Sequence, residues 1–135
     1  MRKILIGFDG SDCSEQAINK ALTLVEKQGE LILLAVIPDQ SDKMFVDKEI
    51  NKHLKQKAEQ IIEDLIKDIG QSEYTLIGMV EEGDPASIII DLANKLNVDL
   101  IVLGSKGTSA LGKYLLGSVA NKVVQYAHTP VMVVR

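Results

Sequence analysis

Short apolar runs alternate with amphipathic stretches along this chain, and the alternation restricts the fold more than any other feature. Five runs are apolar enough to be buried strands, at residues 4–8, 30–37, 74–80, 99–103 and 131–134. Between them, apolar residues recur at helical spacing. Continuous apolar strands that alternate with helices are typical of a parallel sheet covered on both faces. The sequence therefore predicts an α/β fold with a doubly wound, open, five-stranded parallel sheet.

The first two helices are predicted from their end signals and their apolar periodicity. Asp12 and Glu15 form an acidic variant of the capping box, so we expect Asp12 to be the N-cap of the first helix. Gly29 is its expected C-terminal stop. The second helix is expected over residues 43–69, where one apolar stripe runs through charged sequence and ends before Gly70.

The third and fourth helices have clearer start signals. Asp84 followed by Pro85 is typical of an N-cap and a first helical position. That helix is expected to continue through residues 88–96, and the fourth to cover residues 118–127. A chain of 135 residues suits one domain, so we expect a single domain over residues 1–135.

Composition excludes several classes of function. The net charge of −4 and an aromatic content of 4% argue against nucleic-acid binding. A single cysteine, Cys13, excludes an internal disulfide. The apolar run at residues 4–8 is too short for a signal peptide, and no run approaches membrane-spanning length. We therefore expect a cytoplasmic protein that uses neither nucleic acid nor membrane as a partner.

Charge is distributed unevenly along the chain. No acidic residue follows Asp99, and residues 100–135 carry a net charge of +4, whereas residues 1–99 carry −8. Such asymmetry suggests an anion-binding end, although a window this short can also be uneven by chance.

Asp9 follows the first predicted strand. Ligands of open α/β sheets bind at the carboxyl ends of the strands, so a polar residue there is a candidate for binding. Asp9 could accept a hydrogen bond from a sugar hydroxyl or an amine, or lie near a metal. Its alternative role is to cap the first helix, which Ser11 or Asp12 could do as well. Neither the dinucleotide-binding nor the P-loop glycine motif is present.

Glycines concentrate after the fourth predicted strand. Four of the ten glycines lie within residues 104–117, and Gly117-Ser118 opens a helix. Glycines let backbone N–H groups approach an anion, and a helix start attracts phosphate. Lys106 and Lys113 add positive charge. On glycine content alone, a loop whose glycines serve only its turns is the alternative.

The spacing of these glycines identifies a family. Gly104-x2-Gly107-x9-Gly117-Ser118 resembles the nucleotide signature of the ATP-binding branch of the universal stress protein family. The resemblance covers nearly the whole chain, including the opening at residues 3–11, the Gly83-Asp84-Pro85 turn and the ending at residues 129–134. It implies a Rossmann-like sheet with strand order 3-2-1-4-5, which places Asp9 beside Gly104.

The resemblance also implies an adenine-nucleotide site. The residues it assigns are Gly7, Phe8, Asp9, Val36, Leu103, Gly104, Lys106, Gly107, Gly117, Ser118 and Val119. The first three line the nucleoside end, with Asp9 toward the ribose, and Val36 meets the adenine edge through its backbone. Leu103 and Gly104, at the end of the fourth strand, lie under the ribose and α-phosphate. Lys106 and Gly107 lie beside the phosphates, and Gly117, Ser118 and Val119 bind them.

The implied ligand is ATP with Mg²⁺ or Mn²⁺, the metal being held mainly by the phosphates. There is one departure from the family pattern. Many members carry Ser or Thr two residues after the motif serine, where this chain has Ala120. We therefore expect one hydroxyl fewer near the outer phosphates.

The resemblance favours a nucleotide-dependent regulatory module in stress response. It implies a homodimer through the last strand, with a further protein partner that the sequence does not identify. The alternative is an ATP-using enzyme on a related fold, a slow ATPase or an adenylyl transferase, although no residue of the phosphate segment is an evident catalytic base. A receiver-like phospho-acceptor fits poorly, because its third strand would need an Asp where this chain has Val80-Glu81-Glu82.

Overall fold

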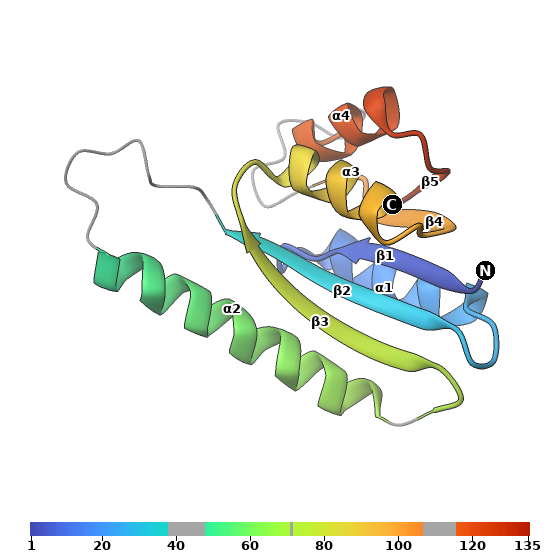
Figure 1. Ribbon diagram of the computed structural model, residues 1–135, viewed down its shortest axis with the longest axis horizontal. Helices are drawn as coiled ribbons and strands as arrows, with labels where there is room; N and C mark the ends of the chain where they lie inside the picture. Colours follow the sequence, from blue (N-terminus) through green and yellow to red (C-terminus); the bar gives the residue numbers. More distant parts are fainter. Residues whose placement is uncertain (38–47, 71, 107–115) are drawn as a thin grey trace.

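The protein is an α/β layered structure in which nine elements alternate along the chain (Figure 1). This computed structural model describes residues 1–37, 48–70, 72–106 and 116–135. The elements are β1 (Lys3–Gly7), α1 (Asp12–Leu24), β2 (Glu30–Ile37), α2 (Lys48–Ile69), β3 (Thr75–Glu82), α3 (Pro85–Lys95), β4 (Leu100–Gly104), α4 (Ser118–Tyr126) and β5 (Val131–Val134).

All five strands form one parallel sheet with the order β3-β2-β1-β4-β5, which confirms the predicted fold. β1 is the central strand, and its Ile6 pairs with Leu33 of β2 on one side and with Val102 of β4 on the other. The chain therefore winds outward from β1 to β3 and then crosses to β4. This crossover point, between the carboxyl ends of β1 and β4, is where open α/β sheets bind ligands.

Helices cover both faces of the sheet. α1 packs over β1, β4 and β5, and α2 packs over β2 and β3, whereas α3 and α4 pack together on the opposite face (Figure 1). Because side chains alternate across a strand, β1 supplies Ile4 and Ile6 to the core beneath α1 and Leu5 to the core beneath α3. These three side chains are completely buried, as expected for a strand with helices on both sides.

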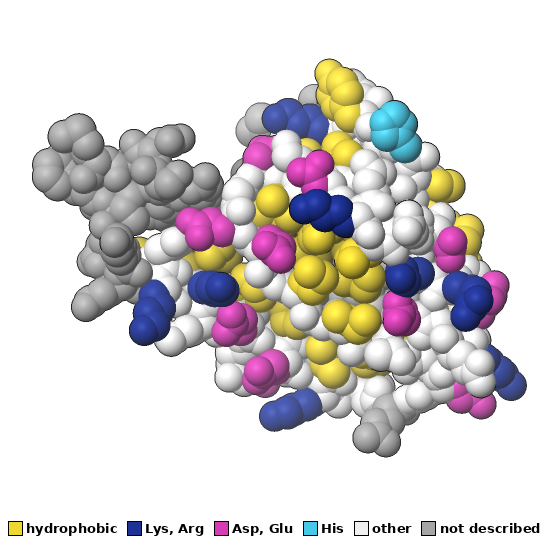
Figure 2. Space-filling view, in the orientation of Figure 1, with side chains coloured by type: hydrophobic (Ala, Val, Ile, Leu, Met, Phe, Trp, Pro, Cys, Tyr) yellow, Lys and Arg dark blue, Asp and Glu magenta, His cyan; other side chains and the backbone are white. Residues whose placement is uncertain are grey.

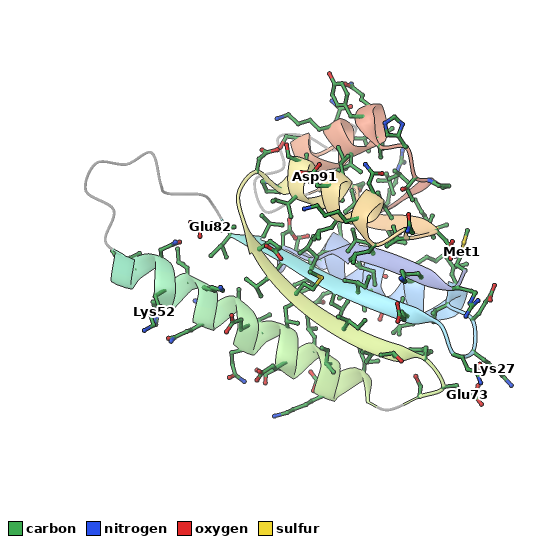
Figure 3. The ribbon with its side chains drawn as sticks, in the orientation of Figure 1. Met1, Lys27, Lys52, Glu73, Glu82 and Asp91 are labelled. Atoms are coloured by element: carbon green, nitrogen blue, oxygen red, sulfur yellow. The ribbon has the colours of Figure 1, made fainter. Side chains whose placement is uncertain are left out.

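The edge strand β3 and the helix α2 beside it are less completely buried than the central strand β1. On the α3 face, Ile77 and Met79 of β3 are half-buried, and Figure 2 shows apolar side chains exposed between α3 and β3. α2 lies at the same edge of the sheet and carries charges of both signs along its outer side (Figure 2). Lys52 of α2 and Asp91 of α3 both point into solvent (Figure 3).

The start of α1 differs from the prediction. Its N-cap is Ser11, not Asp12, and the Ser11 hydroxyl accepts a hydrogen bond from the Ser14 N–H at 3.2 Å. Asp12 is instead the first helical residue, where its negative charge still favours the positive end of the helix dipole.

The end of α1 also differs, because the helix stops at Leu24 and Gly29 is not its terminal residue. Gly29 serves the turn into β2. A Cβ atom there would lie 2.7 Å from the Arg2 carbonyl oxygen, so only glycine lets the two backbones approach this closely.

The starts of α3 and α4 are those that the sequence predicts. Asp84 caps α3 and accepts a hydrogen bond from the Ser87 N–H at 3.1 Å, and α4 begins at Ser118 as predicted. α2 is described from Lys48, and the predicted residues 43–47 lie outside the described part of the chain. None of the helices in the described ranges is long and apolar enough to cross a membrane.

Candidate functional site

The carboxyl end of β1 presents Asp9 to solvent. The Phe8 N–H donates to the Leu34 carbonyl at 2.8 Å, which extends the pairing with β2 one residue beyond β1. Asp9 then turns the chain toward α1, and its Oδ1 atom accepts a hydrogen bond from the Ser11 N–H at 2.9 Å. The side chain therefore holds the turn while Ser11 caps the helix. A carboxylate can accept about four hydrogen bonds, so this contact leaves Asp9 able to accept more.

Gly7 and Leu103 flank the crossover point, and they can contact a ligand mainly through their backbone atoms. Leu103 is buried at 4% exposure and belongs to the core beneath α3. A Cβ atom at Gly7 would lie 2.7 Å from the Leu103 Cδ2 atom, so these neighbouring strand ends are closely packed. Val36 is half-buried near the end of β2, two residues beyond the last β2 residue that pairs with β1.

Gly104 packs directly against the first turn of α1. A Cβ atom at this position would lie 2.7 Å from both the carbonyl carbon and the Cβ atom of Cys13. The Cys13 sulfur also lies 3.9 Å from the Ser105 hydroxyl. Helix α1 is thus seated on the end of β4, and the close approach requires glycine.

The residues after β4 join three other parts of the fold. The Ser105 N–H donates to the Val134 carbonyl of β5 at 2.7 Å, and the Ser105 carbonyl accepts from the Gly117 N–H at 2.7 Å. The Ser11 hydroxyl donates to the Lys106 carbonyl at 3.4 Å. Ser105 is 5% exposed, whereas Lys106 is half-buried. These bonds bring the end of β4, the start of α1 and the start of α4 together.

The start of α4 has the properties of an anion-binding helix terminus. Within the described residues, Gly117 is the N-cap and makes no side-chain capping hydrogen bond. The backbone N–H groups of the first turn are therefore available to a ligand. Gly117 has φ −58° and ψ 156°, a conformation open to any residue, so the backbone itself does not demand glycine. Ser118 is exposed and Val119 is half-buried.

Ala120 does not lie where the sequence reasoning expected it. Its side chain is 3% exposed and belongs to the core beneath α3 and α4. A methyl group there packs against apolar neighbours, so the position contributes to the core and not to the open end of the helix.

The structure therefore assembles most of the predicted site. It gathers the residues at the ends of β1 and β4 with those that open α4, and β2 lies beside β1. Gly107 and Lys113 lie outside the described residues. Ser105 is the residue that sequence reasoning missed, because its contribution is made by its backbone. No residue-type signal in the sequence could have found it, since backbone hydrogen bonds do not depend on the side chain.

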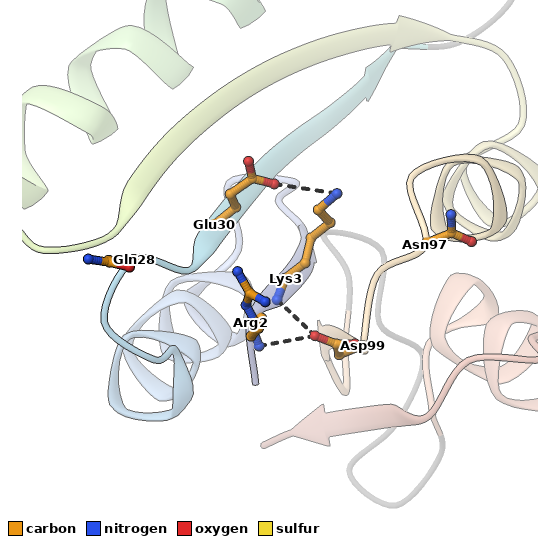
Figure 4. Close-up of a pocket in the computed structure, with 6 residues that line it drawn as sticks. All are labelled: Arg2, Lys3, Gln28, Glu30, Asn97 and Asp99. Carbon is orange, nitrogen blue, oxygen red and sulfur yellow. Dashed lines mark hydrogen bonds and ion pairs between the residues drawn. The ribbon is translucent and has the colours of Figure 1, made fainter.

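A hollow of about 360 Å³ lies at the other end of the strands from the candidate site (Figure 4). There Asp99 Oδ2 accepts from the N–H groups of Arg2 and Lys3 at 3.0 Å each, and the Lys3 Nζ atom lies 3.5 Å from Glu30 Oε2. These groups partner one another. Since the hollow lies at the amino ends of the strands, we assign it a structural role.

A doubly wound parallel sheet with the order β3-β2-β1-β4-β5 and helices on both faces defines a Rossmann-like α/β protein. The model of the universal stress protein family matches residues 1–135. The chain is 34% identical to the universal stress protein YxiE of Bacillus subtilis over 98% of both chains. The chain belongs to the universal stress protein family.

Solved structures agree with this assignment. The protein MJ0577 superposes with a TM-score of 0.88 at 31% identity, covering 98% of this chain and 94% of its own. The universal stress protein UspA of Lactobacillus plantarum has a TM-score of 0.83 at 26% identity, with 98% and 97% coverage. Two structures with less than 25% identity share the fold: a universal stress protein in complex with cAMP, at TM-score 0.67, and an Arabidopsis thaliana member with AMP bound, at TM-score 0.69.

Proposed function

We propose that this protein binds ATP at the crossover point of its sheet, with the phosphates at the start of α4. The observation that carries the proposal is the α4 terminus. Its first turn has no side-chain cap among the described residues and follows a glycine that the backbone conformation does not require. It also lies one hydrogen bond from the end of β4, through Gly117 and Ser105. A helix start in this position attracts phosphate through its free N–H groups and its dipole.

The residues present fit an adenine nucleotide. The phosphate end offers backbone N–H groups, the exposed Ser118 hydroxyl and Lys106, and no acidic residue follows Asp99 to repel an anion. The nucleoside end offers the Asp9 carboxylate as an acceptor for ribose hydroxyls. The nucleotides named for two relatives, cAMP and AMP, are both adenine nucleotides.

Mg²⁺ or Mn²⁺ would accompany the nucleotide, and its charge would offset that of the phosphates. In the part of the chain that the structure describes, no cluster of three His, Cys, Asp or Glu side chains could hold a metal ion. On this proposal the cation takes most of its ligands from phosphate oxygens and water, which is the usual mode for Mg²⁺ with a nucleotide.

We further propose that the protein works as a nucleotide-dependent regulator in stress response and forms a homodimer through β5. β5 is an edge strand of four apolar residues, and all four are half-buried. An exposed apolar edge favours pairing with another strand, and pairing with its own copy about a two-fold axis closes the edge. A further protein partner would respond to the bound nucleotide.

The test is a titration of the purified protein with ATP and magnesium, in the wild type and in Gly117→Val. The backbone conformation of Gly117 accepts valine, so we expect the variant to fold and to keep the wild-type circular dichroism, with a slightly lower melting temperature because valine is a poorer N-cap than glycine. The valine side chain would obstruct the approach of phosphate to the helix start, so we expect ATP affinity to fall at least tenfold. Unchanged affinity in a folded Gly117→Val protein would show that the phosphates do not bind at α4.

A further inference from the structure

We propose that β5 braces the phosphate-binding end of the site, and that Ser105 is the positioning residue that transmits the support. This inference deepens the proposed function and rests on it. It assigns the C-terminal strand a role in ligand binding that is separate from any pairing with a second copy.

The brace consists of two hydrogen bonds on one residue. The Ser105 N–H donates to the Val134 carbonyl at 2.7 Å, and the Ser105 carbonyl accepts from the Gly117 N–H at 2.7 Å. The last residue of β5 is therefore connected to the N-cap of α4 through a single intervening residue. No side-chain torsion lies in this connection, since both bonds are made by backbone groups.

Burial gives these bonds their importance. Ser105 is 5% exposed, so water cannot easily replace either partner. Leaving a buried backbone N–H without an acceptor costs free energy comparable to a lost hydrogen bond. Without Val134, the residue would have to shift to find another acceptor, and Gly117 would move with it.

α1 supports the same residues from the other side. Gly104 contacts the backbone of Cys13, and the Ser11 hydroxyl donates to the Lys106 carbonyl at 3.4 Å. This second support restricts how far the strand end can move and leaves β5 to set the position of Ser105. The nucleoside end has different supports, because Phe8 is bonded to Leu34 of β2.

The inference thus predicts a selective effect. Loss of the Val134 carbonyl should weaken the binding of ligands that carry phosphates. It should leave the binding of adenosine, which has no phosphate, unchanged. A general loss of stability would weaken both. Comparing ATP with adenosine therefore separates a positioning role from a merely structural one.

The experiment compares two shortened chains by NMR titration with ATP plus magnesium and with adenosine. One chain lacks Arg135 only and still ends in Val134, whose carboxylate keeps an oxygen acceptor for Ser105. The other lacks both Val134 and Arg135. We expect the first to bind both ligands as the full chain does. We expect the second to lose about tenfold in ATP affinity, equivalent to about 1.4 kcal/mol, with adenosine affinity unchanged and faster amide exchange at Gly117.

A second variant keeps the test decisive if the shorter chain does not fold. Replacing the amide that precedes Ser105 by an ester removes the N–H donor and leaves every side chain in place. It should reproduce the selective loss of ATP affinity. Equal weakening of both ligands, or of neither, overturns the brace. A full chain that binds neither ligand overturns the proposed function, and this inference with it.

Discussion

Gly104 of β4 and Cys13 of α1 are in backbone contact at the point where the sheet meets the first turn of the helix. A Cβ atom at Gly104 would lie 2.7 Å from the Cys13 carbonyl carbon and 2.9 Å from the Ser14 nitrogen. Backbone atoms cannot swing aside as a side-chain end can. The first glycine of the signature therefore has a packing role in this chain, whatever ligand approaches it from the other side.

Replacing Gly104 by alanine should destabilise the protein. The added methyl group forces α1 away from β4, and overpacking of this kind costs about 1–3 kcal/mol. Urea unfolding followed by circular dichroism measures the loss.

Gly7→Ala is the matched control for that substitution. Gly7 ends the neighbouring strand, and its added Cβ would also meet an atom at 2.7 Å, but that atom is the Cδ2 end of the Leu103 side chain, which can rotate. We expect a clearly smaller loss of stability in Gly7→Ala. Equal losses in the two variants would refute the backbone contact as the cause.

Asp84 should make stability depend on pH. Hydrogen bonds from the backbone and hydroxyl of Ser87 hold the pKa of the Asp84 carboxyl below its ordinary value of 3.8. A lowered folded-state pKa means that the ionised carboxylate stabilises the fold above pH 3.8, and that this contribution is lost as the pH falls through the folded-state pKa.

Asp84→Asn isolates this charge, because asparagine is also a good N-cap. We expect Asp84→Asn to unfold at lower urea than the wild type near neutral pH, and the two midpoints to converge well below pH 3.8. A difference that persists in acid would assign the effect to geometry and not to charge.

Dimerisation through β5 predicts sensitivity to a charge on that edge. Val133→Lys places a cation on a half-buried edge strand, and lysine on an edge opposes strand pairing. Light scattering at micromolar concentration should report a dimer for the wild type and a monomer for the variant. The control variant Ile61→Lys, which adds the same charge at an exposed position of α2, should remain a dimer. A monomeric wild type would reject the proposed interface.

Hydrolysis of ATP should be slow or absent. Among the described residues near the start of α4, Ser105, Lys106 and Ser118 offer no carboxylate, Gln or His to orient a water. Asp9 is the nearest acid proposed for the site, and its Oδ1 atom already accepts from the Ser11 N–H. Binding ATP equally well in the ground and transition states does not accelerate its reaction.

We therefore expect turnover far below the ~1–10³ s⁻¹ typical of enzymes, and we expect Asp9→Ala, assayed at saturating ATP, to keep the same maximal rate because the substitution weakens binding and not chemistry. A phosphate-release assay gives both values. Enzyme-like turnover that disappears in Asp9→Ala would favour the alternative of an ATP-using enzyme.

Much of this fold could be predicted from sequence because parallel strands buried on both sides read as continuous apolar runs. The strand order came from the family resemblance, since periodicity does not say which strands are neighbours. Errors arose where several residues could serve one purpose. Ser11 and Asp12 are both good caps, and the geometry of the preceding turn, held by Asp9, decides for Ser11.

The candidate site was less accessible to sequence reasoning for a physical reason. Backbone hydrogen bonds leave no signature in residue type, so the connection from Val134 through Ser105 to Gly117 could not be foreseen. The family resemblance puts position 120 near the outer phosphates, whereas Ala120 shares an apolar helical stripe with Val123 and Ala127. This stripe faces the core beneath α3 and α4.

The pairing of β1 with β4 also has a consequence for synthesis of the protein. β1 emerges from the ribosome well before its neighbour at the crossover point, which begins at Leu100, and the start of α4 follows at Ser118. Contacts this distant along the chain form late in folding. A nascent chain can therefore pair β1 with β2 long before a phosphate site exists. On the proposed function, only chains that have completed folding could bind the nucleotide, and binding would stabilise only those chains.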